Sequence, residues 1–298
     1  MKYEAAAPFR QALEARLQNE AARRGTSIVR LRKLVTFDRL LARLSVAAPG
    51  RWVLKGALAI EFRTGVGGRA TRDVDLARAD DARAALADFE AAQRTDLGDH
   101  FLFVLERSGA VDAEDEPAGA RYRATAELAG RPFETVLVDV AFSDPQLWAP
   151  ELVRGPDLLA FAGIEPSETP TLPLEQHLAE KVHAYTRTYA GGRRSSRVKD
   201  LADMVLLRTM APLDAHRVRL ALDRTFDARG THPLPRTLPP PSRSWRVPYR
   251  RLASDTGIEE DLDKGFSLVA ELVDPVLGGE AVEAWDPEVS RWIRADEL

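Results

Sequence analysis

The segment RATRDVDLAR, residues 69–78, contains two aspartates one residue apart among small and apolar residues. Its central run VDL has the composition of a β-strand, so Asp73 and Asp75 should project from the same face of that strand. Two carboxylates held side by side repel each other unless a positive charge lies between them. The segment therefore predicts a strand that presents a pair of carboxylates to a cation.

The composition is that of an ordinary globular chain of 298 residues, of which 45% are hydrophobic. A net charge of −4 argues against an extensive nucleic-acid-binding surface but permits a local basic patch. The chain has no cysteine, which excludes disulfides, thiolate nucleophiles and cysteine zinc sites and fits a reducing compartment. Neither a signal peptide nor a membrane-spanning run is found in the sequence. We therefore expect a soluble cytoplasmic protein without a membrane partner.

The hydrophobic pattern predicts an α+β fold. Helical periodicity extends over residues 8–47, with a break at 24–27 where Thr26 or Ser27 caps the second helix. Further elements are strands, mostly antiparallel, at 52–54, 74–76, 100–107, 120–128 and 131–142, and helices at 57–62 and 81–94. From residue 174 the pattern is again helical, with amphipathic helices at 175–189 and 197–210, and a proline-rich connector at 231–245 leads to a final helical segment around 258–275. We expect N-terminal helices at 1–48, a mixed-sheet core at 49–168 and a mainly helical portion at 169–298.

Two further features surround the paired aspartates. Gly56 lies at a predicted strand-to-helix turn, where glycine lets the backbone approach a ligand and the helix offers free N–H groups to a phosphate. Asp139 interrupts an apolar strand, where an unpaired charge would cost several kcal/mol. Either a cation or an arginine must meet it. We favour the cation, because hard divalent ions bind oxygen ligands and three carboxylates could supply them.

Five segments, in this order, resemble the AbiEii/AbiGii-type nucleotidyltransferase toxins: VLKGALAIEF (53–62), TRDVDL (71–76), LVDVAF (137–142), EKVHAYTR (180–187) and RVKDLADM (197–204). These toxins belong to the DNA polymerase β-like nucleotidyltransferase superfamily and include tRNA-modifying toxins of mycobacteria. The resemblance covers residues 50–210 and continues more weakly to 250. It implies a nucleotidyltransferase-type mixed sheet flanked by helices, and an enzyme that transfers a nucleoside monophosphate from an NTP to an acceptor. It also implies a cognate antitoxin and, as the favoured acceptor, the 3′ end of tRNA.

The resemblance also implies the residues of the site. Two Mg²⁺ ions would be held by Asp73, Asp75 and Asp139, and the same three residues would act in catalysis together with Lys181 and Asp200. The nucleotide would be bound by Lys55, Gly56, Ala57, Arg72, Arg193, Arg194, Arg197 and Lys199. The turn in the family is usually Gly-Gly or Gly-Ser, whereas Ala57 keeps the backbone N–H and offers no hydroxyl to the triphosphate. Asp200 could pair with Lys199 or Lys181, or contact the ion.

An RNA acceptor requires basic surface beyond the nucleotide site. We expect it from Arg187, Arg193, Arg194 and Arg197, and from PSRSWRVPYRR (241–251), where Trp245 and Tyr249 could stack on bases. Alternatively, these two aromatic residues anchor the proline-rich connector to the core. Other functions also stay open: a non-catalytic nucleotide- or RNA-binding module, a nucleotidyltransferase acting on a protein or small molecule, or DNA binding through RRGTSIVRLRKL (23–34).

Overall fold

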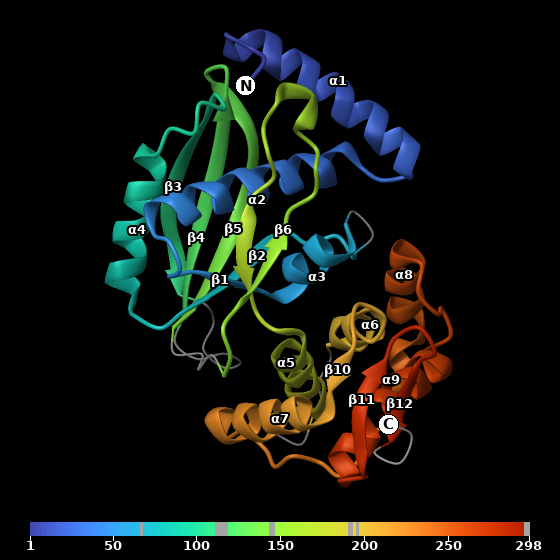
Figure 1. The fold of residues 1–298 in the computed structure, drawn as a ribbon. Helices are drawn as coiled ribbons and strands as arrows, with labels where there is room; N and C mark the ends of the chain where they lie inside the picture. Colours follow the sequence, from blue (N-terminus) through green and yellow to red (C-terminus); the bar gives the residue numbers. More distant parts are fainter. Residues whose placement is uncertain (66–67, 111–118, 143–146, 190–192, 195–196, 295–298) are drawn as a thin grey trace. The chain divides into compact units, whose positions relative to one another are not determined.

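In the computed structural model the chain forms two compact units (Figure 1). The structure describes residues 1–65, 68–110, 119–142, 147–189, 193–194 and 197–294. The first unit comprises Met1–Val66, Ala70–Gln146 and Pro150–Leu172, and the second comprises Gly67–Arg69, Leu147–Ala149 and Pro173–Leu298. The predicted boundary at 168–169 lies just before the passage from Leu172 to Pro173. The two N-terminal helices, predicted as a separate segment, are part of the first unit.

The predicted N-terminal helices are confirmed as α1 (Ala6–Arg24) and α2 (Ile28–Ala47). Gly25 ends α1 in the left-handed conformation with φ 63°, and the Ser27 hydroxyl begins α2 by accepting from the backbone N–H of Arg30 at 3.2 Å. In Figure 1, α2 runs across one face of the sheet of the first unit. The break at residues 24–27 therefore lets the second helix turn back over the sheet.

The sheet of the first unit has seven strands in the order β3-β4-β5-β2-β1-β7-β6. Their bounds are β1 Val53–Lys55, β2 Asp73–Arg78, β3 Phe101–Ala110, β4 Gly119–Leu128, β5 Arg131–Phe142, β6 Glu151–Arg154 and β7 Glu168–Thr171. β2 runs parallel to β5 and β1 parallel to β7, whereas the other neighbours are antiparallel. The predicted mixed sheet is confirmed, with β6 and β7 as strands that the hydrophobic pattern did not indicate.

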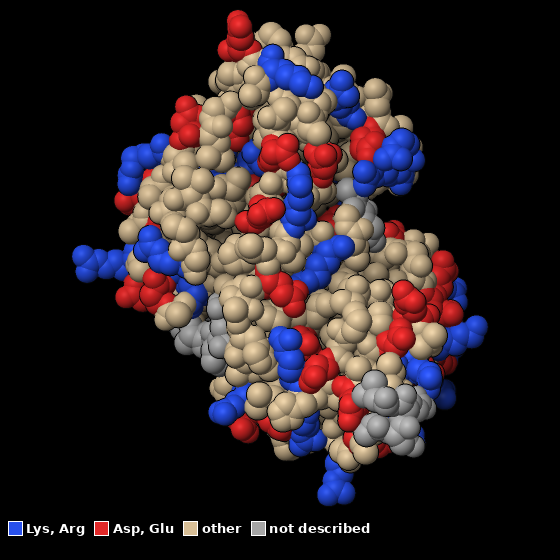
Figure 2. Space-filling model, in the orientation of Figure 1, with Lys and Arg blue, Asp and Glu red and all other residues tan. Residues whose placement is uncertain are grey.

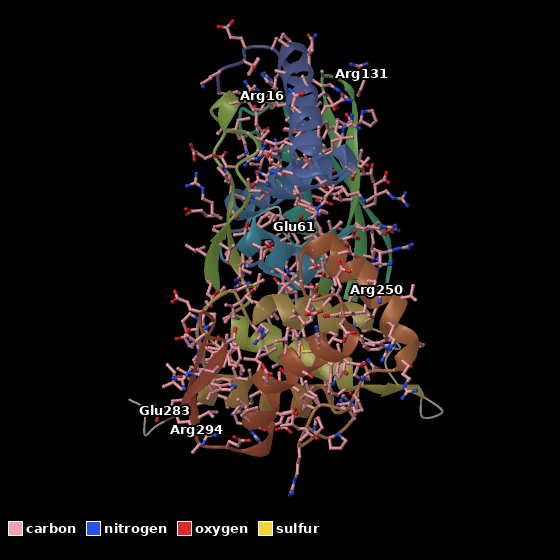
Figure 3. The ribbon with its side chains drawn as sticks, turned by 90° about the vertical axis from the view of Figure 1, so that its right-hand side faces the viewer. Arg16, Glu61, Arg131, Arg250, Glu283 and Arg294 are labelled. Atoms are coloured by element: carbon pink, nitrogen blue, oxygen red, sulfur yellow. The ribbon has the colours of Figure 1, made fainter. Side chains whose placement is uncertain are left out.

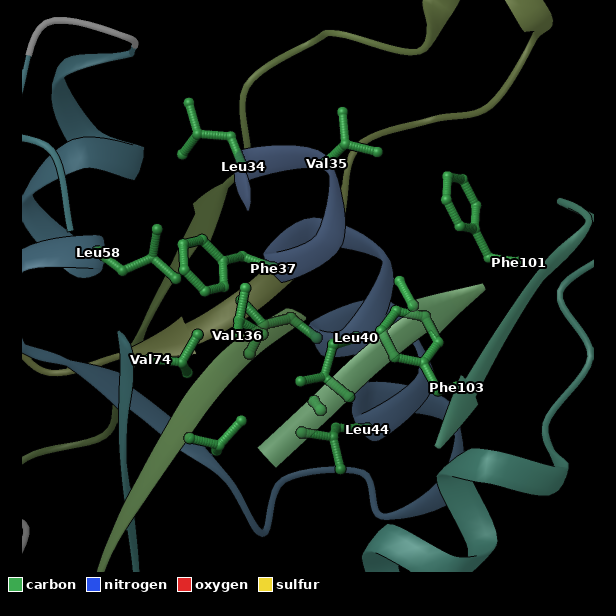
Figure 4. Close-up of a cluster of buried hydrophobic side chains, with 14 of the residues drawn as sticks. Leu34, Val35, Phe37, Leu40, Leu44, Leu58, Val74, Phe101, Phe103 and Val136 are labelled. Atoms are coloured by element: carbon green, nitrogen blue, oxygen red, sulfur yellow. The ribbon is translucent and has the colours of Figure 1, made fainter. Parts of the chain in front are cut away.

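One face of this sheet is buried against helices. Figure 4 shows Leu34, Val35, Phe37, Leu40 and Leu44 of α2 beside strand side chains that include Val74, Val136, Phe101 and Phe103. Burial of each such side chain contributes about 1.5–3 kcal/mol to folding. Helix α3 (Gly56–Thr64) follows β1, and α4 (Ala82–Arg94) contacts β3 and α2. Because side chains alternate along a strand, the polar residues of β2, β4 and β5 are directed to the opposite face.

The second unit is mainly helical, as predicted. Its helices are α5 Leu174–Thr186, α6 Val198–Leu207, α7 Ala215–Arg229, α8 Arg246–Thr256 and α9 Leu262–Gly278. β10 (Leu213–Asp214), β11 (Val282–Asp286) and β12 (Arg291–Arg294) form a small antiparallel sheet, and β8 (Thr188–Tyr189) pairs with β9 (Arg193–Arg194). Among the described helices, none combines the length and the apolar character that crossing a bilayer requires.

The predicted connector at 231–245 is wrong at its end. Arg243–Trp245 forms a 3₁₀ turn and α8 follows directly, since Pro248 falls within the first turn, where a missing N–H is tolerated. Trp245, Tyr249 and Ala253 are buried at helical spacing, and Trp245 and Tyr249 are only 8% and 0% exposed. The prediction that these two rings stack on RNA bases is therefore wrong, and they anchor the helix instead.

Candidate active site

Four charged residues of the first unit occupy one row across the sheet. In the strand register Lys55 of β1 lies opposite Asp75 of β2, Asp75 opposite Asp139 of β5, and Asp139 opposite Arg121 of β4. Directly opposed residues on neighbouring strands project from the same face. Asp73 lies two positions from Asp75 on β2 and therefore shares that face. The structure thus brings the three predicted carboxylates to one face, with a positive residue at each end of the row.

Asp139 forms a two-bond ion pair with Arg121. Nε of Arg121 donates to Oδ1 at 2.6 Å and Nη2 donates to Oδ2 at 2.7 Å. The side chains are 39% exposed for Arg121 and 13% for Asp139. Of the two partners considered for this buried carboxylate, the structure shows the arginine. Among the described residues, no three His, Asp or Glu side chains form a group that could hold a metal ion, so the three carboxylates share a face without converging.

The turn between β1 and α3 is shaped around Asp75. Gly56 has φ +67°, and a Cβ at this position would lie 1.9 Å from Oδ2 of Asp75. Glycine was expected there to admit a ligand, but the nearest group is the carboxylate itself. Ala57 is buried on the first turn of α3, and Lys55 precedes this helix with a side chain only 7% exposed. Of the predicted nucleotide-binding residues of this turn, Gly56 therefore lies against Asp75 and Lys55 lies opposite it in the strand register.

Asp73 has a different environment. The Thr71 hydroxyl donates to Oδ1 of Asp73 at 2.8 Å, and the Asp73 side chain is partly exposed. Arg72, predicted to bind nucleotide, is exposed. Asp73 and Asp75 supply hard oxygen donors from alternate positions of one strand, which is chemistry that fits a divalent cation. Among the described residues of this face, Asp73 and Asp75 are therefore the candidate cation ligands.

Lys181 is the centre of a buried ion cluster in the second unit. Its Nζ lies 3.1 Å from Oδ1 of Asp200 and 2.8 Å from Oδ2 of Asp203. Arg69 joins the cluster, with Nε 2.8 Å from Oδ1 of Asp203. The Lys181 side chain is only 12% exposed, so this residue is not part of a solvated helix edge.

The neighbouring charges in this cluster set the ionisation states of Lys181 and Asp203. Burial acts to lower the pKa of Lys181, but the carboxylates of Asp203 and Asp200 outweigh it and hold the pKa above its usual value. Burial acts to raise the pKa of Asp203, but Lys181 and Arg69 outweigh it and lower the pKa to about 2. Lys181 is therefore a permanent cation near neutral pH, suited to electrostatic stabilisation and not to proton abstraction.

The structure places two of the other predicted residues of the second unit. Asp200 pairs with Lys181, whereas the side chain of Lys199 is exposed. Oδ2 of Asp200 is buried and accepts no hydrogen bond from any described residue. The side chains of Arg193 and Arg194 lie outside the described part of the chain. The sequence assigned no role to Asp203 or Arg69, although Asp203 follows Asp200 at helical i+3 spacing in KDLAD.

Several arginines of the basic segment 23–34 pair with carboxylates of their own unit. Arg30 lies 2.7 Å from Glu61, Arg32 lies 2.6 Å from Glu14, and Arg23 lies 2.7 Å from Glu20. Glu61, which Figure 3 labels on α3, is only 1% exposed. On the face drawn in Figure 2, Lys and Arg side chains are interspersed with Asp and Glu. These pairs weaken the hypothesis that segment 23–34 binds DNA.

Comparison with known proteins is consistent with the resemblance in the sequence. The model of the family described as nucleotidyl transferase AbiEii toxin, type IV TA system, matches residues 39–274. No curated protein matches the chain. The fold is similar to that of MenT4, a nucleotidyltransferase toxin from Mycobacterium tuberculosis, at 20% identity and a TM-score of 0.58 over 89% of this chain and 98% of that one. JHP933 from Helicobacter pylori is more distant, at 14% identity and a TM-score of 0.45 over 83% of this chain and 91% of that one.

Proposed function

Because the chain belongs to the nucleotidyl transferase AbiEii toxin family, we propose that it transfers a nucleoside monophosphate from an NTP to the 3′ end of tRNA with the help of Mg²⁺. It is a nucleotidyltransferase of the toxin class, for which an antitoxin partner is expected. Loss of a functional tRNA 3′ end would block translation. The tRNA acceptor and the requirement for Mg²⁺ are the parts that need testing.

The observation that carries the proposal is the position of Asp73 and Asp75. They share one face of β2, and the second lies against Gly56 at the start of α3. A helix N-terminus offers unpaired N–H groups to phosphate oxygens, while the two carboxylates offer ligands to a divalent cation. An NTP with its cation needs both kinds of group within a few ångströms of each other.

The reaction forms a bond between the acceptor oxygen and the α-phosphorus and breaks the bond to pyrophosphate, while the acceptor hydroxyl loses its proton. Bound Mg²⁺ would supply Lewis-acid stabilisation of the attacking and leaving oxygens. Asp73 and Asp75 would hold the ion. We assign the permanent charge of Lys181 to the triphosphate, where it would offset the negative charge that builds on the leaving group. Positioning and electrostatics supply most of the rate in such transfers.

The proposal is tested by incubating the protein with Mg²⁺, total RNA and each of the four NTPs, labelled at the α-phosphate, followed by denaturing gel analysis. We expect one labelled band of tRNA size, which 3′ exonuclease treatment shortens and strips of label. Asp75→Asn should abolish the label. Glu106→Gln, which removes an exposed acid from β3, is the matched control and should retain it.

The other acceptors give distinct results. Label that survives nuclease but not protease would identify a protein acceptor, and pyrophosphate release without labelled macromolecule would identify a small molecule. Binding of NTP without release of pyrophosphate from any mixture would contradict an enzymatic function. In that case the chain would be a nucleotide-binding module.

A further inference from the structure

Arg121 occupies both oxygens of the carboxylate that lies beside the paired aspartates. Asp139 is directly opposite Asp75 in the parallel pairing of β5 with β2, and neighbouring strands lie about 4.8 Å apart. Two carboxylates at that separation on one face repel each other. The bonds of 2.6 and 2.7 Å from Arg121 to Asp139 therefore relieve a repulsion within the site.

The position of Arg121 allows its guanidinium to leave. Its side chain is 39% exposed, and an ion pair with that exposure is screened by water. On the side away from Asp139, the residue opposite Arg121 is Gly109 of β3, which has no side chain. Apart from its own chain neighbours, no described atom lies within 4 Å of the position that a Cβ of Gly109 would take. At this register position β3 therefore presents no side chain to the Arg121 guanidinium.

We propose that Arg121 is an internal counter-ion that competes with the divalent cation for Asp139. The inference rests on the proposed function, since it assumes that the cation is bound at Asp73 and Asp75. A cation that also takes Asp139 as a ligand meets the guanidinium at the same two oxygens, and two positive groups at one carboxylate repel each other. Arg121 must then release Asp139. The site therefore binds cation more weakly than its three carboxylates alone would allow.

Arg123 provides a matched control. It lies two residues from Arg121 on β4 and so on the same face, and it is exposed. Its register partner on β5 is Leu137, which carries no charge. Arg123→Gln changes the net charge by the same amount as Arg121→Gln and leaves the pair with Asp139 intact. The difference between the two variants therefore isolates the competition from a general change in electrostatic potential.

The test is titration of the full-length protein with Mn²⁺ in the absence of nucleotide, with free Mn²⁺ measured by electron paramagnetic resonance. We expect Arg121→Gln to lower the Mn²⁺ Kd about fivefold, which corresponds to about 1 kcal/mol at 1.4 kcal/mol per factor of ten. Arg123→Gln should change the Kd by less than about twofold. Arg121→Lys keeps the charge but loses the two-bond geometry and should give an intermediate Kd.

The outcomes separate the inference from the function on which it rests. If Asp75→Asn removes Mn²⁺ binding but Arg121→Gln binds Mn²⁺ no more tightly than Arg123→Gln, Arg121 does not compete and the inference fails alone. If no Mn²⁺ binding depends on Asp73 or Asp75, both the inference and the proposed cation site fail. Melting temperatures of all variants verify that each is folded at the temperature of the titration.

Discussion

A side chain at position 56 and the carboxylate of Asp75 would occupy the same space, since a Cβ on Gly56 would lie 1.9 Å from Oδ2 of Asp75. Gly56 belongs to the turn that begins α3, and Asp75 belongs to β2. This position therefore requires glycine for two reasons: its φ is +67°, and a side chain there would collide with Asp75. The paired aspartates depend on this turn for their geometry.

Gly56→Ala should therefore inactivate the protein. The positive φ destabilises alanine by about 1 kcal/mol, and the methyl group must in addition displace the Asp75 carboxylate. Gly130→Ala is the control, because Gly130 has φ +68° and open space around its Cβ position. We expect the strained backbone to lower the free energy of unfolding, measured in urea, by a similar amount in both variants. Only Gly56→Ala should lose NMP transfer. Normal transfer by Gly56→Ala would show that the position of Asp75 is not critical.

Much of this site could be predicted from local pattern, because the relevant information lies within single strands. The alternation in RDVDLAR places Asp73 and Asp75 on one face whatever the strand pairs with. The position of Asp139 beside Asp75 depends instead on the register between β2 and β5, which are distant in sequence. Arg121 is harder still to identify, since the register of β4 includes a β-bulge at Ala126/Glu127 and many arginines could serve as the partner.

In the second unit, too, local patterns predict helices but not the contacts between them. The heptad-like apolar spacing in EQHLAEKVHAYT predicts α5, but it does not reveal that Lys181 is buried with two carboxylates. That arrangement requires α6 to pack beside α5, which is a tertiary property. Pro248 obscured α8, because a proline in the first turn of a helix and a proline in a connector give the same local signal.

Asp203→Asn should destabilise the protein more than Asp200→Asn. Asp203 is fully buried and pairs with both Lys181 and Arg69, whereas Lys181 is the one cation among the described residues that pairs with Asp200. Removing one partner from a buried ion pair costs about 3–5 kcal/mol, because the remaining charges stay buried. We expect urea unfolding to show a loss of about 3 kcal/mol for Asp203→Asn and about 1 kcal/mol or less for Asp200→Asn. Equal losses would mean that Lys181 compensates by pairing with either carboxylate.

His183 should make stability fall as the pH falls from 6.5. Burial, followed by the nearby His232 and arginines, lowers its pKa to about 3. The unfolded chain then binds a proton below pH 6.5 that the folded chain does not, so stability is full above pH 6.5 and declines toward pH 3, by at most about 1.4 kcal/mol per pH unit. Melting temperatures between pH 4.5 and 7.5 should show a shallower decline for His183→Gln. His216→Gln, at an exposed position, is the control. Parallel profiles for His183→Gln and the wild type would exclude His183 as the source of the decline.

The exposed arginines of α8 should contribute to binding of an RNA acceptor. Arg250 and Arg251 of α8 and Arg243 of the preceding 3₁₀ turn are exposed, whereas Trp245 and Tyr249 are buried, and Figure 3 shows Arg250 on α8. Arg246 is also exposed but is paired with Asp263 at 2.6 Å, so the contact should come mainly from the other three. Each phosphate contact in single-stranded RNA contributes about 0.7 to the slope of log K against log salt concentration. The double change Arg250→Gln and Arg251→Gln should therefore reduce this slope by about 1.4 for tRNA, measured by fluorescence anisotropy over a salt series.

The same change at Arg23 and Arg24, which pair with Glu20, is the matched control. An unchanged slope in the α8 variant would place the RNA elsewhere, and a slope near zero in the wild type would favour a protein or small-molecule acceptor.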